Sequence, residues 1–109
     1  MKLWAALLLA VIAQAQTTHS VTLAWTDSLN PSGTTYSVYR APTACSNSPV
    51  FAKVAINLTI KSYLDSNIAP GSYCYQVSAT FSGVESGPSN NSTAAVGAFS
   101  PTNLTVTIQ

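Results

Sequence analysis

Residues 73–81 read YCYQVSATF and contain the clearest structural pattern in the chain. Every second residue is aromatic or apolar, namely Tyr73, Tyr75, Val77 and Ala79, and the residues between them are small or polar. Successive side chains of a β-strand point to opposite faces, so a period of two indicates a strand with one buried face. The pattern predicts a central strand of a β-protein.

Weaker segments with the same period lie on both sides of this strand and are separated by turn-forming residues. They are residues 20–25 (SVTLAW), 36–40 (YSVYR), 50–55 (VFAKVA), 59–65 (TIKSYLD) and 92–99 (STAAVGAF). No segment after residue 16 keeps a helical period over ten residues. Many short strands joined by frequent turns predict an all-β fold, an antiparallel sandwich or barrel.

The inward faces of the expected strands predict the hydrophobic core. Residues 59–65 offer Ile60 and Tyr63, although their alternation is imperfect. Trp25, the largest inward side chain, is expected to be buried. The predicted core consists of Val21, Leu23, Trp25, Tyr36, Val38, Tyr73, Tyr75 and Val77.

The first fifteen residues have the pattern of a secretory signal peptide. Lys2 precedes an apolar run from Leu3 to Ala13, and Ala13-Gln14-Ala15 fits the small-x-small cleavage rule. The run is shorter than the roughly 20 apolar residues that a membrane-spanning helix needs. The alternative is an N-terminal helix that is not cleaved. We therefore expect a signal peptide at 1–15, a domain at 16–99 and a C-terminal strand or tail at 100–109, in a secreted protein.

Charged residues are scarce in this chain, and their scarcity excludes several kinds of partner. Charged residues make up 6% of the sequence, against about 25% in an average domain. There is no basic surface for nucleic acid and no polybasic face for a membrane. Without residues 1–15 the remaining charges cancel, which removes a barrier to self-association. The polar residues are largely Ser and Thr, as in a secreted structural protein or simply in a β-protein with Thr-rich strands.

Cys45 and Cys74 are the two cysteines of the sequence. In an exported chain they are expected to form a disulfide. Such a bond would close a loop of about 30 residues and stabilise the fold by about 3.5 kcal/mol. A metal or redox pair is the weaker reading, because the spacing is not C-x-x-C and His19 is the single histidine.

No residue set indicates catalysis. A hydrolytic triad needs a histidine beside a nucleophile, and His19 lies near the expected start of the mature chain. Asp27, Asp65 and Glu85 fall in separate turns, so the sequence shows no carboxylate pair and no calcium loop. We expect no enzyme activity, no cofactor and no bound metal.

Several segments resemble a fibronectin type III domain, in the order of that family and over residues 20–96. They are VTLAW, YSVYR, SYLDSNIAPGSYCYQVSAT and ESGPSN. Val21-x-Leu23-x-Trp25 resembles strand B of the family, and Tyr36-x-Val38 resembles strand C. The resemblance implies that Tyr73 is the tyrosine-corner residue, with its hydroxyl bonded to the backbone just upstream. It implies a two-sheet sandwich and no particular function.

The chain departs from this resemblance at both ends. The family's strand A should precede strand B, but only QTTHS precedes Val21. At the other end, residues 100–109 (SPTNLTVTIQ) resemble a strand A, because Leu104, Val106 and Ile108 alternate with polar residues. This strand could dock in a neighbouring copy, dock in its own domain, or remain a loose tail.

The sequence therefore predicts a secreted, non-enzymatic structural or assembly module. Its partners would be copies of itself, joined head-to-tail by donation of the C-terminal strand. One alternative is an extracellular module that binds carbohydrate or protein through its loops and Tyr39. Another is a fragment of a multi-domain protein.

Overall fold

The structure is a computed structural model that describes residues 19–99, 101 and 104–107. The predicted signal peptide and Ile108 lie outside these residues. The described residues form strands and contain no helix, and thus none that is long and apolar enough to cross a membrane. The strands are β1 (His19–Ala24), β2 (Thr35–Ala41), β3 (Ala52–Leu58), β4 (Ser62–Ile68), β5 (Gly71–Phe81), β6 (Val84–Glu85) and β7 (Ser92–Val96).

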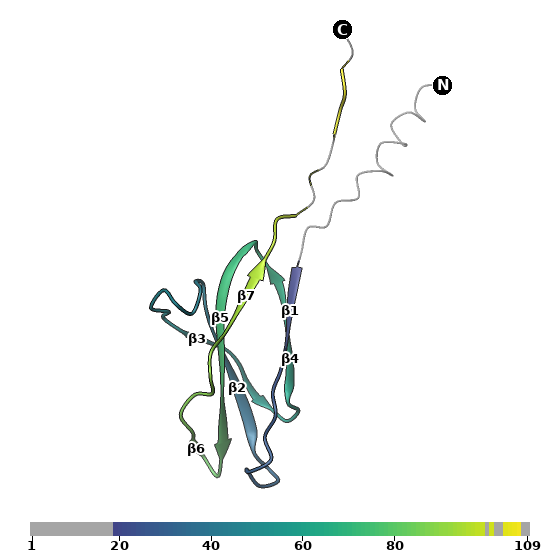
Figure 1. Cartoon of the computed structure of the whole chain (residues 1–109). Coiled ribbons are helices and arrows are strands. Elements are labelled where there is room, and N and C mark those ends of the chain that lie inside the picture. The colour runs from purple at the N-terminus through teal and green to yellow at the C-terminus, as the bar shows by residue number, and fades with distance from the viewer. Residues whose placement is uncertain (1–18, 100, 102–103, 108–109) are drawn as a thin grey trace, which may run out of the picture.

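Two antiparallel sheets face each other (Figure 1). The smaller sheet pairs β1 with β4. The larger sheet has five strands in the order β3-β2-β5-β6, with β7 also paired to β5. This arrangement confirms the predicted all-β, antiparallel sandwich class.

The central strand β5 contains the YCYQVSATF pattern, and its residues 74–80 pair with the whole of β2, with Val77 opposite Val38. It ends in a two-residue turn, Ser82-Gly83, where both residues have positive φ. Such turns suit the right-handed twist of paired strands. The turn places β6 directly beside the end of β5.

The core lies between the sheets and is thinner on the β1 side. Tyr36, Val38, Tyr75 and Val77 are buried. The other predicted core residues, Val21, Leu23, Trp25 and Tyr73, pack against this cluster but are only partly buried. Trp25, expected to be buried, is thus half-buried. The physical reason is that no described strand covers the outer side of β1.

A disulfide joins Cys45 to Cys74, as predicted, with 4.9 Å between the Cα atoms. It ties the loop after β2 to β5. In addition, the Cys45 N–H donates a hydrogen bond to Thr93 Oγ1 in β7. The bridge therefore holds three neighbouring segments of the larger sheet together.

A polar cluster connects the two sheets. Asp65 in β4 is only 4% exposed. Its carboxylate accepts hydrogen bonds from the Arg40 guanidinium at 2.8 and 3.0 Å and from the Tyr75 hydroxyl at 2.6 Å. Arg40 and Tyr75 belong to the larger sheet. The cluster therefore fixes the position of β4, and with it β1, over the larger sheet.

Candidate assembly groove

The outer edge of β1 has no partner among the described residues. The Trp25 N–H donates to the Lys61 carbonyl, on the side of β4. Backbone groups alternate in direction along a strand, so those of Leu23 and Val21 also face β4. The N–H and C=O groups of Thr22 and Ala24 therefore face the open edge. They are placed to pair with one more strand.

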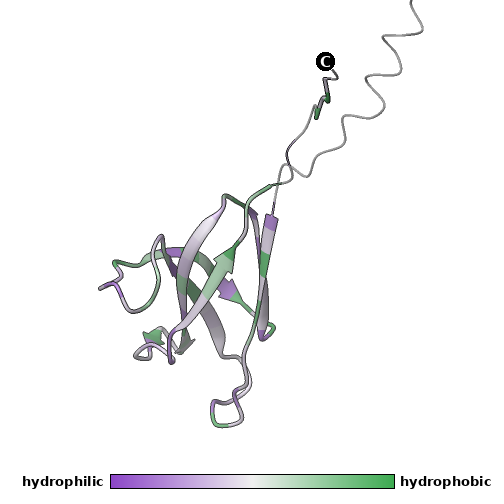
Figure 2. Cartoon of the chain, turned by 45° about the horizontal axis from the view of Figure 1, so that its top comes forward, coloured by the Kyte–Doolittle hydropathy of each residue, from purple (hydrophilic) through white to green (hydrophobic). Residues whose placement is uncertain are grey.

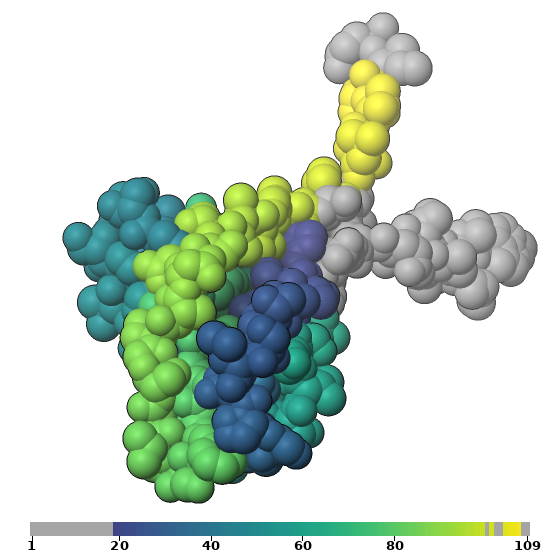
Figure 3. Space-filling view, turned by 60° about the horizontal axis from the view of Figure 1, so that its bottom comes forward, coloured from purple at the N-terminus to yellow at the C-terminus, as the bar shows by residue number. Residues whose placement is uncertain are grey.

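A groove of about 270 Å³ runs along this edge, between β1 and β7. In the space-filling view, part of β1 (purple) remains visible between the light-green chain of β7 and the blue loop after β1 (Figure 3). The residues that line the groove are uncharged. They are Val21, Thr22, Leu23, Ala24, Trp25, Tyr75, Gln76, Val77, Ser89, Asn90, Ser92 and Ala94.

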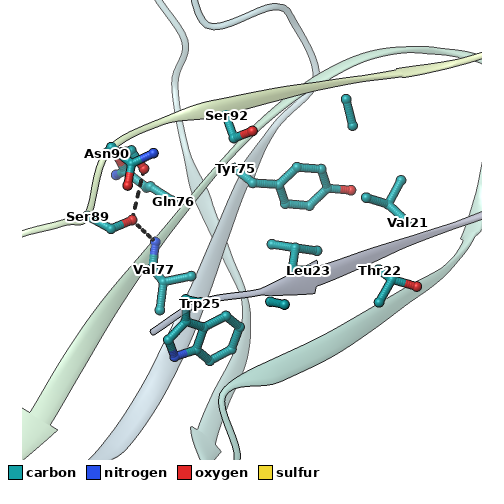
Figure 4. Close-up of a pocket in the computed structure, with 12 residues that line it drawn as sticks. Val21, Thr22, Leu23, Trp25, Tyr75, Gln76, Val77, Ser89, Asn90 and Ser92 are labelled. Carbon is teal, nitrogen blue, oxygen red and sulfur yellow. Dashed lines mark hydrogen bonds between the residues drawn. The ribbon is translucent and has the colours of Figure 1, made fainter. Parts of the chain in front are cut away.

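The floor of the groove is apolar and comes from both sheets. Val21 and Leu23 lie in β1 and Trp25 directly follows it, while Tyr75 and Val77 come from β5. Figure 4 shows these side chains in the space between β1 and β7, with Trp25 toward one end and Val21 toward the other. The floor is thus the exposed flank of the core itself.

The far wall of the groove is polar and firmly attached to β5. The Ser89 N–H donates to the Val77 carbonyl at 2.7 Å, and the Val77 N–H donates to Ser89 Oγ at 2.9 Å. Ser89 Oγ in turn donates to the Asn90 carbonyl. These bonds hold the segment before β7 beside β5 and away from β1. Ser89 and Asn90 have the pattern of ordinary turn residues in the sequence, so nothing there indicates that they form the wall of a site.

The C-terminal segment exposes apolar side chains that alternate with polar ones in the sequence. Leu104 and Val106 are 89% and 80% exposed. Figure 1 shows this segment (yellow) beyond the end of β7 and away from both sheets. In the hydropathy view it combines apolar (green) and polar (purple) residues, and no strand lies beside it (Figure 2). Of the predicted assembly strand, the described part therefore lies outside the groove.

The tail leaves the domain at the end where β1 begins. The Phe99 ring stacks on the His19 ring, with 4.5 Å between centroids and 8° between planes. His19 is the first residue of β1, and Trp25 follows the last. The segment after Phe99 thus starts at the opposite end of the groove from Trp25.

Tyr39, the residue considered for carbohydrate stacking, is engaged with its neighbours on the larger sheet. Its hydroxyl donates to the Glu85 carboxylate, and Lys53 Nζ lies 5.4 Å from the ring centroid. Glu85 also accepts a hydrogen bond from Ser78. The hydrogen bonds from Ser78 and Tyr39 lower the pKa of Glu85 below its ordinary value. One face of the Tyr39 ring is therefore covered by a charged side chain.

Among residues 19–99, 101 and 104–107, no group of three or more His, Cys, Asp or Glu side chains could hold a metal ion. The three acidic residues lie apart, with Asp27 in the loop after β1, Asp65 in β4 and Glu85 in β6. The groove, with its apolar floor beside an unpaired strand edge, is therefore the candidate site.

No protein-family model matches the chain, and a search of the curated proteins finds no match. The groove, the tail and the sequence pattern are therefore the features that bear on function.

Proposed function

We propose that this protein is a secreted, non-enzymatic structural module that joins to further copies of itself. In this proposal the groove between β1 and β7 receives the C-terminal segment, residues 100–109, of a second copy. The observation that supports it is the presence in one chain of an open apolar groove beside an unpaired strand edge and an exposed segment with strand periodicity. Addition of a strand to an exposed edge is a known mode of peptide recognition.

The fibronectin type III resemblance supports the same proposal. The Tyr73 hydroxyl donates to the Ala69 carbonyl at 2.8 Å, as the tyrosine corner of that resemblance implies. The order of strands in both sheets is compatible with a sandwich of this kind that lacks its first strand. The groove would then be the place where the family's strand A lies.

Secretion is part of the proposal and is supported by two features. Residues 1–15 have the charge, apolar run and cleavage pattern of a signal peptide. The Cys45–Cys74 disulfide suits an oxidising compartment.

A comparison of free energies indicates that the association would need every apolar residue of the segment. Full burial of one Val, Leu or Ile side chain contributes about 1.5–3 kcal/mol, and a backbone hydrogen bond a net ~0.5–1.5 kcal/mol. Association itself costs about 4–15 kcal/mol. The free energy gained from burial and hydrogen bonding is thus similar in size to the cost of association. Loss of one apolar side chain should therefore be enough to separate the copies.

The alternative of a carbohydrate- or protein-binding module has less support. The Tyr39 hydroxyl is occupied by Glu85, and Lys53 lies over the ring. Neither observation favours an open aromatic platform for a sugar.

The test compares the size in solution of the exported protein with that of three variants. Sedimentation velocity at increasing concentration should show multimers for the parent chain. Deletion of 103–109 and Val106→Asp should each give a monomer. Thr105→Asp is the matched control, because Thr105 belongs to the outward set of the segment, and it should still multimerise.

A labelled peptide with the sequence of residues 100–109 completes the test. It should bind the Val106→Asp chain, whose own tail cannot fill the groove. A parent chain that stays monomeric at all concentrations, or a deletion variant that multimerises equally well, would disprove strand donation.

A further inference from the structure

We infer that the donated strand runs antiparallel to β1, and that its start lies at the Trp25 end of the groove. This inference rests on the proposed function and adds direction and register to it. The residues expected side by side are Leu104 with Trp25, Val106 with Leu23, and Ile108 with Val21.

The register follows from the apolar floor. Residues opposite one another in an antiparallel pair point to the same face. The inward residues that line the groove along β1 and directly after it are Val21, Leu23 and Trp25. The donor segment has three apolar residues at the same spacing of two. One antiparallel register places all three apolar pairs over the groove.

The two neighbouring registers meet residues that already have partners. A shift of two residues one way puts Leu104 beside Asp27, whose carboxylate accepts hydrogen bonds from the Asn30 side chain and the Tyr36 hydroxyl. A shift the other way puts Ile108 beside His19, whose ring is stacked on Phe99. Each shift removes one apolar side chain from the floor, so the central register is preferred.

The same register also assigns the backbone hydrogen bonds. The N–H and C=O groups of Thr22 and Ala24 face the open edge of β1, as the bond from Trp25 to Lys61 requires. In the central register Thr107 lies opposite Thr22, and Thr105 lies opposite Ala24. These threonines would exchange backbone hydrogen bonds with β1 while their side chains face outward.

A chain cannot place its own tail in this way while Phe99 stays on His19. From His19 to Trp25 is six residues of β-strand, about 20 Å. From Phe99 to Leu104 is five residues, about 17 Å at full extension, and the tail would also have to reverse direction. The antiparallel strand must therefore come from a second copy, stacked with its Trp25 end toward the first copy's tail.

The opposite direction is geometrically open to the chain's own tail and gives a different neighbour. A strand parallel to β1, with its apolar side chains inward, would begin with Leu104 beside Val21. Thr105, instead of Thr107, would then lie beside Thr22. Direction can thus be read from which threonine approaches Thr22.

The experiment uses two double variants of the full exported chain, Thr22→Cys with Thr107→Cys and Thr22→Cys with Thr105→Cys. Thr22 and both tail threonines are outside the apolar floor. Directly opposed residues have Cα atoms about 5.5 Å apart, within the range of a disulfide. Diagonal neighbours are about 7–8 Å apart, beyond that range. Each single cysteine variant is a control for random oxidation.

After mild oxidation, the variant with cysteines at 22 and 107 should give a ladder of covalent oligomers on non-reducing electrophoresis. The variant with cysteines at 22 and 105 should stay uncross-linked, although sedimentation shows it to be multimeric. Cross-linking at 22 and 105 between chains would overturn the inferred direction, and so would multimers that form without any link between 22 and 107; in both cases the assembly would stand. A link between 22 and 105 within one chain would place the tail in its own groove and would contradict strand donation as well. A protein that is never multimeric would instead disprove the proposed function.

Discussion

Asp65 links the two sheets through a buried carboxylate that serves both Arg40 and Tyr75. Removing one partner of a buried ion pair costs more than the pair contributes, because the other charge loses its compensation. The Arg40 side chain is 31% exposed, so water offsets part of that loss. Asp65→Asn should lower the free energy of unfolding by about 2–4 kcal/mol.

Urea denaturation in the Val106→Asp background would measure this loss on a chain without a donor strand. The double variant Arg40→Met with Asp65→Leu is the control, since it removes both charges. It should recover part of the lost stability, because the uncompensated charge is gone while the buried Tyr75 hydroxyl still lacks its acceptor. If Asp65→Asn is as stable as its parent, the cluster does not hold the sheets together.

Asp27, in the loop beside the Trp25 end of the groove, gives the chain an acid-sensitive loop. The Asn30 side chain, at 2.6 Å, and the Tyr36 hydroxyl, at 2.8 Å, hold the pKa of Asp27 well below its ordinary value. A lowered folded pKa means that the carboxylate stabilises the fold above its unfolded pKa, about 4. This contribution is lost as the pH falls through the folded pKa.

The free energy of unfolding measured from pH 7 to pH 2 should therefore decline below about pH 4. Asp27→Asn should start less stable and show a shallower decline. Glu85 also has a lowered pKa, from Ser78 and Tyr39, so Glu85→Gln should flatten the same limb independently. An unchanged acid limb in both variants would contradict the assignment.

At the scale of elements, the disulfide joins the loop after β2 to β5 and contacts β7 through Thr93. The chain-entropy model predicts that replacing both cysteines by alanine costs about 3.5 kcal/mol. The cavity left beside the fully buried Cys74 adds to this cost. Thermal unfolding of the Cys45→Ala, Cys74→Ala double variant would measure it. A change in melting temperature within error would show that the loop is held by other contacts.

The alternation of β5 predicted its place in the fold but only one of its two buried faces. Tyr75 and Val77 face the core as expected. Cys74 and Ser78, on the other face, are buried as well. Cys74 is bonded to the loop that contains Cys45, while Ser78 is bonded to Glu85. A period of two reports side-chain direction, and it does not tell whether a loop later covers the outer face.

Other expectations depended on neighbours that the sequence does not show. The sequence pattern predicts Ile60 on the inward face, but it lies in the turn between β3 and β4 and is exposed. The pattern also predicts Asp65 in a turn, whereas it lies in β4 and its carboxylate contacts Arg40. Its spacing of two from Tyr63 was a signal that it shares the inward face. The groove itself lies between β1 and the segment before β7. These two parts are far apart in the sequence, and only the folded sandwich brings them together.

At the scale of the whole molecule, the proposed association between copies should depend little on salt, because the groove is uncharged. No residue that lines the groove is charged, and residues 100–109 contain no charged side chain. Screening acts on charges, so the association constant should change little between low and high sodium chloride. Sulfate, which strengthens apolar burial, should tighten it. Sedimentation across a salt series would decide, and a strong loss of association with sodium chloride would point to a different, ionic interface.

The position of the tail at the end where β1 begins also has a mechanical consequence. In a row of copies joined as inferred, tension along the row would pull the donated strand parallel to its own axis. All backbone hydrogen bonds between that strand and β1 would then bear the load together, in shear, instead of opening one after another. The Cys45–Cys74 bridge would limit how far each domain could stretch. Pulling on a single joined pair should therefore show one high-force rupture at the joint. A row of copies would extend little before one of its joints broke.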